Sequence, residues 1–429
     1  MKTILLKGGR VIDPANGIDA KHNILIKGER IAASGPEVSP PEGAEVIDCK
    51  GYIISPGLID MHTHLREPGR EDKETIKTGI AAAAAGGFTS IACMPNTSPV
   101  NDTASVTEFI LRKAKEMGTV QVLPVGAITK GLKGETLSEM GELKDAGAIA
   151  LSDDGRPVKN SDLMRHAMEY AGMFDLLIIS HCEDLDLAGD GVINEGRMST
   201  RLGLSGIPSE AEEVIVAREI CLSRLTKRPI HIAHVSTAGS VHLIRMAKKE
   251  GVHITAEVTP HHLCLSEEAV ADFDTNTKVN PPLRSKADQD ALIEGLLDGT
   301  IDAIASDHAP HTLAEKELEY TFAPFGIIGM ETSLPLILTK LYHQKIMDFT
   351  QIVQKMSLNP ACILNLDKGR LSPGSIADLT VIDPEKEKVV DVSAFRSKAR
   401  NCPFNGWSLK GYPVITICHG RIVFRETPD

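Results

Sequence analysis

The feature that most constrains the fold is a series of eight short apolar runs separated by segments with helical periodicity. The runs are rich in Ile, Val and Ala, as expected of strands that are buried on both faces. Several of the segments between them open with Ser or Thr or close with Gly, which predicts helices. The runs occupy residues 52–62, 88–96, 120–128, 146–154, 176–184, 229–236, 253–262 and 301–311, and the predicted helices include 74–86, 103–116, 161–173, 209–225, 239–250 and 287–298.

Eight strands that alternate with helices are typical of a (β/α)8 barrel. A doubly wound open sheet is the competing architecture, but it does not explain why polar residues follow nearly every apolar run. We therefore predict an α/β fold in which residues 52–365 form a TIM-type (β/α)8 barrel that carries the catalytic site.

The two ends of the chain have a different pattern, with the period-two alternation of antiparallel strands. This pattern covers residues 3–13, 22–35, 375–390 and 413–424. The segment HGRIV at 419–423 also echoes GGRVI at 8–12. We predict that the chain ends pair in one small β-domain beside the barrel, formed by residues 1–51 and 366–429.

Charge and composition exclude several classes of protein. The chain has 46 Lys and Arg against 58 Asp and Glu, a net charge of −12, so it lacks the basic field that a nucleic-acid partner requires. No stretch approaches the roughly 18 apolar residues of a membrane span, and the N-terminus reaches Gly, Arg and Asp too early for a secretion signal. The eight cysteines form no CxxC pair. We expect a cytoplasmic protein with neither a nucleic-acid nor a membrane partner.

Histidines and carboxylates follow the apolar runs. His62 and His64 end the first run, and residues two apart on a strand point to the same side, so both imidazoles could bind one metal ion. Alone, such a pair is more often two core or surface histidines than a metal site. However, later runs end in His181, His234 and Asp307, and all strand ends of a barrel converge on one cleft. Such ligands suit two zinc-class ions that share a bridging ligand.

Taken together, the motifs at these strand ends resemble bacterial dihydroorotases of the longer, type I class, within the amidohydrolase superfamily of metal-dependent barrels. The resemblance covers essentially the whole chain. The motifs are HTHLREPG (62–69), MPNT (94–97), SDDG (152–155), HCED (181–184), TPHHL (259–263), NPPLR (280–284), SDHAPH (306–311) and PFGIIGMET (324–332).

The resemblance implies two zinc ions per chain. His62, His64 and Asp307 would hold one ion, and His181 and His234 would hold the other.

The bridging ligand departs from the pattern of many relatives. Those relatives place a carboxylated lysine after strand four, where this chain has no lysine, the nearest being Lys144 and Lys159. The type I pattern puts Asp154 at this position, with Asp153 as the less favoured alternative.

The resemblance also implies the substrate contacts. Arg66 and Asn96, helped by His311, would bind an α-carboxylate, because a guanidinium recognises a carboxylate through two parallel hydrogen bonds that lysine cannot reproduce. The remaining polar contacts would fall on the ring amides. The full predicted set is His64, Arg66, Asn96, Asn280, His311, and the backbone at Phe325 and Gly326.

The implied reaction is the reversible hydrolysis of (S)-dihydroorotate to N-carbamoyl-L-aspartate in pyrimidine biosynthesis. Asp307 would act as the catalytic residue, taking a proton from the attacking water and delivering it to the departing ring nitrogen. One alternative is another cyclic amidase, of the allantoinase or dihydropyrimidinase type, which has no substrate carboxylate for Arg66 to bind. A second is a non-catalytic scaffold for aspartate transcarbamoylase, but such a protein should have lost ligands. We also expect a homodimer, with aspartate transcarbamoylase as a candidate partner.

Overall fold

The computed structural model describes residues 2–426 and contains two large sheets. The first consists of eight strands in the order β15-β14-β13-β10-β9-β8-β7-β6, and all neighbouring pairs are parallel. A parallel bridge between Thr63 and His308 joins its two edges, which closes the sheet into a barrel. The strands are β6 (Leu58–Thr63), β7 (Phe88–Cys93), β8 (Gln121–Gly126), β9 (Ala150–Leu151), β10 (Leu177–Ser180), β13 (Ile230–Ile232), β14 (Ile254–Val258) and β15 (Ala303–Ile304).

Each of the eight apolar runs contributes one barrel strand, which confirms the predicted (β/α)8 fold. The six predicted helices are also present, with ends within two residues of the expected positions. Polar caps fix several of these ends: the side chains of Thr75, Asn160, Thr237 and Ser285 accept hydrogen bonds from first-turn amides. The helices are α1 (Ile76–Ala85), α2 (Ala104–Met117), α4 (Ser161–Ala171), α7 (Glu210–Thr226), α8 (Ala238–Lys249) and α10 (Lys286–Leu297).

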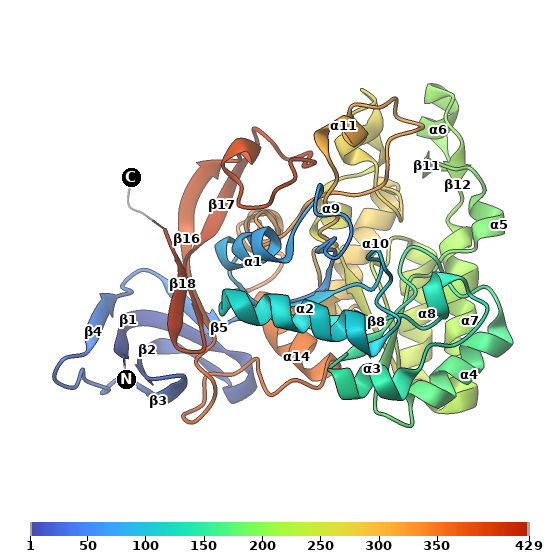
Figure 1. Ribbon diagram of the computed structural model, residues 1–429. Coiled ribbons are helices and arrows are strands. Elements are labelled where there is room, and N and C mark those ends of the chain that lie inside the picture. Colours follow the sequence, from blue (N-terminus) through green and yellow to red (C-terminus); the bar gives the residue numbers. More distant parts are fainter. Residues whose placement is uncertain (1, 427–429) are drawn as a thin grey trace.

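The second sheet combines strands from both ends of the chain, and Figure 1 shows the blue N-terminal and red C-terminal strands together beside the barrel. Its order is β18-β17-β16-β5-β1-β2-β3, with β4 beside β1. The strands are β1 (Thr3–Asp13), β2 (Ile18–Lys27), β3 (Arg30–Gly35), β4 (Glu45–Asp48), β5 (Ile53–Pro56), β16 (Leu379–Val389), β17 (Ser408–Cys418) and β18 (Arg421–Arg425).

The chain ends share this sheet, but β1 and β16 do not pair directly, because β5 lies between them and pairs with both. The strand β5 falls within residues 52–365, the range expected for the barrel, although it belongs to the terminal sheet. The division of the chain into domains at these boundaries stays a prediction.

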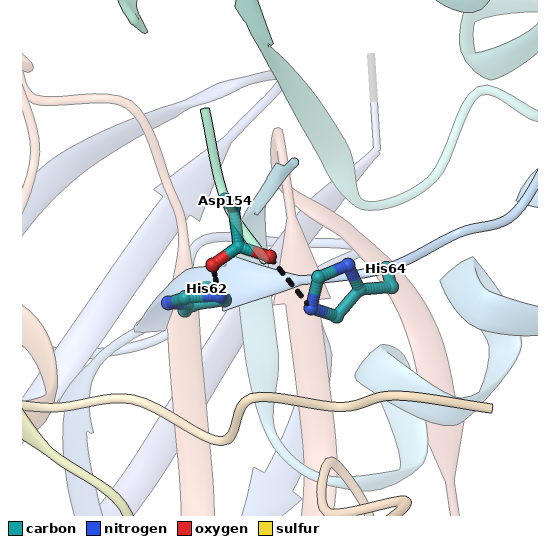
Figure 2. Close-up of side chains that lie close together, drawn as sticks. All are labelled: His62, His64 and Asp154. Carbon is teal, nitrogen blue, oxygen red and sulfur yellow. Dashed lines mark ion pairs between the residues drawn. The ribbon is translucent and has the colours of Figure 1, made fainter. Parts of the chain in front are cut away.

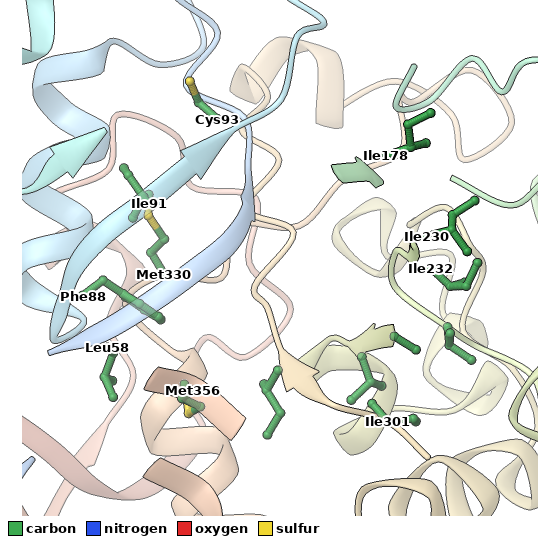
Figure 3. Close-up of a cluster of buried hydrophobic side chains, with 14 of the residues drawn as sticks. Leu58, Phe88, Ile91, Cys93, Ile178, Ile230, Ile232, Ile301, Met330 and Met356 are labelled. Atoms are coloured by element: carbon green, nitrogen blue, oxygen red, sulfur yellow. The ribbon is translucent and has the colours of Figure 1, made fainter. Parts of the chain in front are cut away.

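Both faces of the barrel strands are buried, which explains their continuous apolar sequences. Consecutive residues point to opposite faces, and they fall into two separate clusters: Ile91 and Ile232 belong to the larger one, while Ala92 and Ala233 belong to the other. Figure 3 shows part of the larger cluster, with Phe88 among the strand residues.

Within residues 2–426, no helix is both long and apolar enough to cross a membrane.

Candidate metal centre and active site

The six predicted ligands come from the carboxyl ends of five barrel strands. His62 lies in β6 and His64 follows it, while the others come directly after their strands or up to three residues later. All six are buried. The later ligands are Asp154 after β9, His181 after β10, His234 after β13 and Asp307 after β15.

His62, His64 and Asp154 form the first group that could hold a metal ion. Figure 2 shows the Asp154 carboxylate between the two imidazoles. The Nε2 atom of His62 lies 3.3 Å from Asp154 Oδ1, and the Nε2 atom of His64 lies 3.6 Å from Oδ2. Asp307 adjoins this group, because its Oδ1 atom is 3.0 Å from His64 Nε2 and 3.6 Å from His62 Nε2.

Asp154, His181 and His234 form the second group. His181 Nδ1 and His234 Nε2 are 2.9 Å apart, and each lies 3.7 Å from Asp154 Oδ1. Asp154 is therefore common to both groups, as a bridging ligand would be.

The neighbouring Asp153 points elsewhere. It accepts hydrogen bonds from the amides of Ile128 and Thr129 and from the Thr129 hydroxyl, which fastens the loop after β8. Burial raises the pKa of Asp153 to about 6. This geometry favours Asp154 over Asp153 as the bridging residue.

Buried donors around the cluster fit a metal ion. The Nδ1 atom of His62 donates to Glu257 Oε1 at 2.8 Å, which leaves the Nε2 lone pair for a ligand. That Nε2 atom is fully buried and has no hydrogen-bond partner within residues 2–426. An unpartnered buried nitrogen is costly in a protein core, and nitrogen and carboxylate donors together suit zinc-class ions.

The electrostatics of the cluster keep its carboxylates ionised. Burial opposes the charge of Asp154, but the neighbouring imidazoles of His62 and His234 hold the pKa of Asp154 well below its ordinary value. Burial also opposes the charge of Asp307, but the neighbouring imidazoles of His62 and His64 lower the pKa of Asp307 as well. Ionised carboxylates are the form that binds cations.

Three predicted site residues have left-handed backbone conformations that non-glycine residues rarely adopt. Their φ angles are +61° at Arg66, +30° at His234 and +47° at Asp307. Such conformations cost about 1–3 kcal/mol each and persist where the surrounding structure requires them, often at functional sites. All three occur in the segments that follow barrel strands.

Arg66 and Asn96 lie beside the first metal group. Arg66 donates through Nε to the Pro310 carbonyl at 3.2 Å, and no acceptor within residues 2–426 takes a hydrogen bond from its terminal nitrogens. Burial lowers the pKa of Arg66 to about 10, and the group stays charged. Asn96 links two predicted ligands, accepting from His64 Nδ1 at 2.9 Å and donating to Asp154 Oδ2 at 3.2 Å.

The other predicted substrate contacts are engaged by protein groups. Asn280 donates to both oxygens of Glu183 at 3.1 Å, and His311 Nε2 donates to the Phe325 carbonyl at 2.7 Å. The Gly326 amide donates to the Lys278 carbonyl. Their roles toward a substrate therefore stay predictions.

Two buried carboxylates in the site were missed by sequence reasoning. Glu257, in β14, accepts from His62, and Glu183 lies 3.3 Å from His181 Nε2. Glu183 follows His181 by two residues, a spacing that could have indicated it. Glu257 gave no such signal, because its partner His62 is 195 residues away in sequence.

The barrel and its cluster of histidines and carboxylates define an amidohydrolase-type enzyme. A family profile described as dihydro-orotase-like matches residues 51–240. The chain is 57% identical over 424 residues to the dihydroorotase of Syntrophus aciditrophicus and 56% identical over 423 residues to that of Pelotomaculum thermopropionicum, with 99% of each chain covered in both cases. The chain belongs to the dihydroorotase family.

Solved structures support the same fold. The L-hydantoinase (dihydropyrimidinase) from Arthrobacter aurescens superposes with a TM-score of 0.89 at 26% identity, covering 99% of this chain and 96% of that chain. The dihydropyrimidinase from Brevibacillus agri gives a TM-score of 0.85 at 24% identity, covering 99% and 95%. The dihydropyrimidinase alternative shares the architecture, whereas full-length sequence similarity favours the dihydroorotase family.

Proposed function

We propose that this protein catalyses the reversible hydrolysis of (S)-dihydroorotate to N-carbamoyl-L-aspartate, with ring closure as the biosynthetic direction. Family membership over the full chain supports the reaction class. Arg66 carries the choice of substrate, because its terminal nitrogens have no protein acceptor within residues 2–426 and lie beside the metal ligands. A substrate carboxylate would satisfy them with two charge-assisted hydrogen bonds.

We assign two zinc ions to the cluster. His62, His64 and Asp307 would hold one, His181 and His234 the other, and Asp154 would bridge them. Bound zinc would supply a Lewis acid that polarises the ring carbonyl and lowers the pKa of water.

The chain's own residues would bind the substrate and move the proton. Asp307 would take the proton of the attacking water and deliver it to the ring nitrogen as the amide bond breaks, and the same carboxylate would act in reverse during ring closure. Arg66, Asn96 and His311 would bind the α-carboxylate. The ring amides would meet Asn280 and the backbone at Phe325 and Gly326, which requires some of the present protein contacts to give way.

The test compares substrates and a conservative variant. Zinc-loaded protein should hydrolyse dihydroorotate faster than dihydrouracil, hydantoin or allantoin. In Arg66→Lys the charge remains but the paired hydrogen bonds are lost, so kcat/KM for dihydroorotate should fall about 10- to 150-fold. Zinc content should not change, and any activity toward uncharged cyclic ureides should fall far less.

Arg70 provides the matched control. It is an exposed arginine four residues away that pairs with Asp72 and Glu315, so Arg70→Lys should leave kcat/KM near the wild-type value. An equal loss on charged and uncharged substrates in Arg66→Lys would mean that Arg66 supports the fold, and a preference for dihydrouracil would favour the dihydropyrimidinase alternative.

The same proposal places the enzyme in the cytoplasm as a homodimer, with aspartate transcarbamoylase as a candidate partner. These assignments rest on the family resemblance. Size-exclusion chromatography with light scattering tests the homodimer and the partner. A monomeric mass of the purified chain would contradict the homodimer. Two unshifted elution peaks in a mixture with the transcarbamoylase of the same organism would contradict the partner.

A further inference from the structure

The connection between β16 and β17, residues 390–407, leaves the terminal sheet and packs against the loops at the barrel mouth. Figure 1 shows this red connection extending from the upper ends of the two strands. Ala399, Cys402 and Phe404 are buried in one cluster with Ile327 and Ile328, which follow the predicted Phe325–Gly326 contact. A C-terminal segment thus forms part of the wall beside the active site.

Asn401 is the polar centre of this contact. It is 3% exposed, and its amide nitrogen donates to the carbonyls of Ala309 and Gly326 at 2.9 and 3.0 Å. Its side-chain oxygen accepts from the His311 amide at 3.1 Å, and its backbone carbonyl accepts from the Ile328 amide at 3.0 Å. Both amide hydrogens are used, and no other residue type of this size supplies two donors and an acceptor in this arrangement.

The two segments that Asn401 joins carry predicted substrate contacts and already touch. Gly326 has a φ of +145°, and a Cβ atom there would lie 2.7 Å from the Ala309 carbonyl oxygen and 2.9 Å from the His311 ring. The His311 ring in turn donates to the Phe325 carbonyl. Glycine is therefore required at 326, and small movements of either segment would displace the other.

Arg66 depends on the same segment. Its Nε atom donates to the carbonyl of Pro310, which lies between the two residues, Ala309 and His311, that Asn401 holds. The proposed carboxylate ligand is thus oriented by a backbone that Asn401 fixes.

Packing alone does not hold this region in place. A cavity of about 380 Å³ adjoins His311 and Asn401 and is also lined by Phe273, Thr275 and Lys316. On the side that faces this cavity, the hydrogen bonds of Asn401 add to the apolar packing against Ile327 and Ile328 in holding the Ala309–His311 segment.

We infer that Asn401 is a positioning residue that joins the Ala309–His311 segment to the Phe325–Gly326 turn and thereby sets the affinity for substrate. This inference rests on the proposed function, since it takes the substrate contacts from it. Asn401 itself would touch neither the substrate nor a metal ion.

Two variants and one control test the inference. Asn401→Asp keeps the size and the acceptor for His311 but replaces both donors with an oxygen that faces two carbonyls, while Asn401→Ala removes all three side-chain bonds. The control is Asn405→Ala in the same connection, where the exposed Asn405 side chain makes one hydrogen bond within residues 2–426, accepting from the Val392 amide. Circular dichroism and melting temperature establish that each variant is folded.

Kinetics give the first readout. In both Asn401 variants we expect KM for dihydroorotate to rise about 10- to 100-fold while kcat changes by less than about threefold and zinc content is unchanged. Asn405→Ala should match the wild type. Equal KM values in all proteins would overturn the inference, as would a loss of kcat together with zinc, which would indicate a general role in folding.

Hydrogen–deuterium exchange gives a readout that needs no substrate. The amides of His311 and Ile328 should exchange faster in Asn401→Ala than in the wild type or in Asn405→Ala. Unchanged exchange of these amides would contradict the positioning role of Asn401. If the wild type failed to hydrolyse dihydroorotate, the proposed function would be wrong; KM would then be measured on the cyclic amide that the protein does hydrolyse, and an unchanged KM there would overturn the inference separately.

Discussion

Replacing Glu257 with Gln tests how the barrel core controls its metal site. Glu257 is fully buried in β14, where one oxygen accepts from His62 Nδ1 at 2.8 Å and the other lies 3.2 Å from His231 Nε2. Burial opposes its charge, but the neighbouring imidazoles of His231 and His62 lower the pKa of Glu257 to about 2. An ionised acceptor at this position fixes the proton on Nδ1 and directs the Nε2 lone pair toward Asp154.

The expected magnitude follows from the change in this one hydrogen bond. A hydrogen bond to a charged acceptor contributes about 1.5–3 kcal/mol and one between neutral groups about 0.5–1.5 kcal/mol, so Glu257→Gln should lose about 1–1.5 kcal/mol. This loss corresponds to about 5- to 13-fold in the dissociation constant for zinc. Loss of a hydrogen-bond partner behind a metal-bound histidine generally weakens metal affinity by about 10- to 100-fold. The value expected for Glu257→Gln lies near the lower end of this range.

The assay is a zinc titration against a competing chelator at fixed pH, with metal content read by mass spectrometry. Only the ion at His62 should bind more weakly. Glu267→Gln is the control, because Glu267 is a buried carboxylate that accepts from Asn194 instead of a proposed ligand. Wild-type zinc affinity in Glu257→Gln would refute the reasoning.

Three further predictions concern the same site. His181→Ala should lose one of two zinc ions and all turnover, and two retained ions would contradict its assignment as a ligand. Asp154→Ala should lose more zinc than Asp153→Ala, because the Asp153 carboxylate is engaged by the loop after β8; metal analysis showing the opposite order would transfer the bridging role to Asp153. The effects of Glu257→Gln and Asn401→Ala on kcat/KM should multiply within about twofold, since the two residues share no hydrogen-bond partner, and a larger deviation in the double variant would reveal coupling.

The barrel strands and main helices could be predicted because each is encoded locally. The strands are apolar on both faces, as the consecutive residues Ile91 and Ala92 illustrate, and the helices have caps such as Thr75 and Ser285. The proximity of the candidate ligands could be predicted for a related reason, because a barrel brings every strand end to one cleft.

The strand β5 shows where local encoding was insufficient. Residues 52–62 form one apolar run, yet Ile53–Pro56 pairs in the terminal sheet and Leu58–Thr63 pairs in the barrel. The change occurs at Gly57, where a Cβ atom would lie 2.1 Å from the Thr89 hydroxyl oxygen. The Pro56–Gly57 pair marks this break within the run, but the contact with Thr89 that requires glycine at 57 lies 32 positions away in sequence.

The polar residues that escaped prediction share a dependence on distant partners. Glu257 accepts a hydrogen bond from a histidine that is 195 residues away in sequence. Asn401 bonds to segments that are 75 to 92 residues away. Neither lies in a pattern that a single sequence could reveal, because a Glu inside a strand or an Asn inside a loop is ordinary until its partners are known. The candidate metal ligands come from strand ends, whereas the predicted substrate contacts lie on loops that long-range hydrogen bonds hold. Substitution of a candidate metal ligand should therefore lower the metal content, and substitution of a predicted substrate contact should weaken substrate binding. Metal content and KM must be measured together to assign any residue of this site.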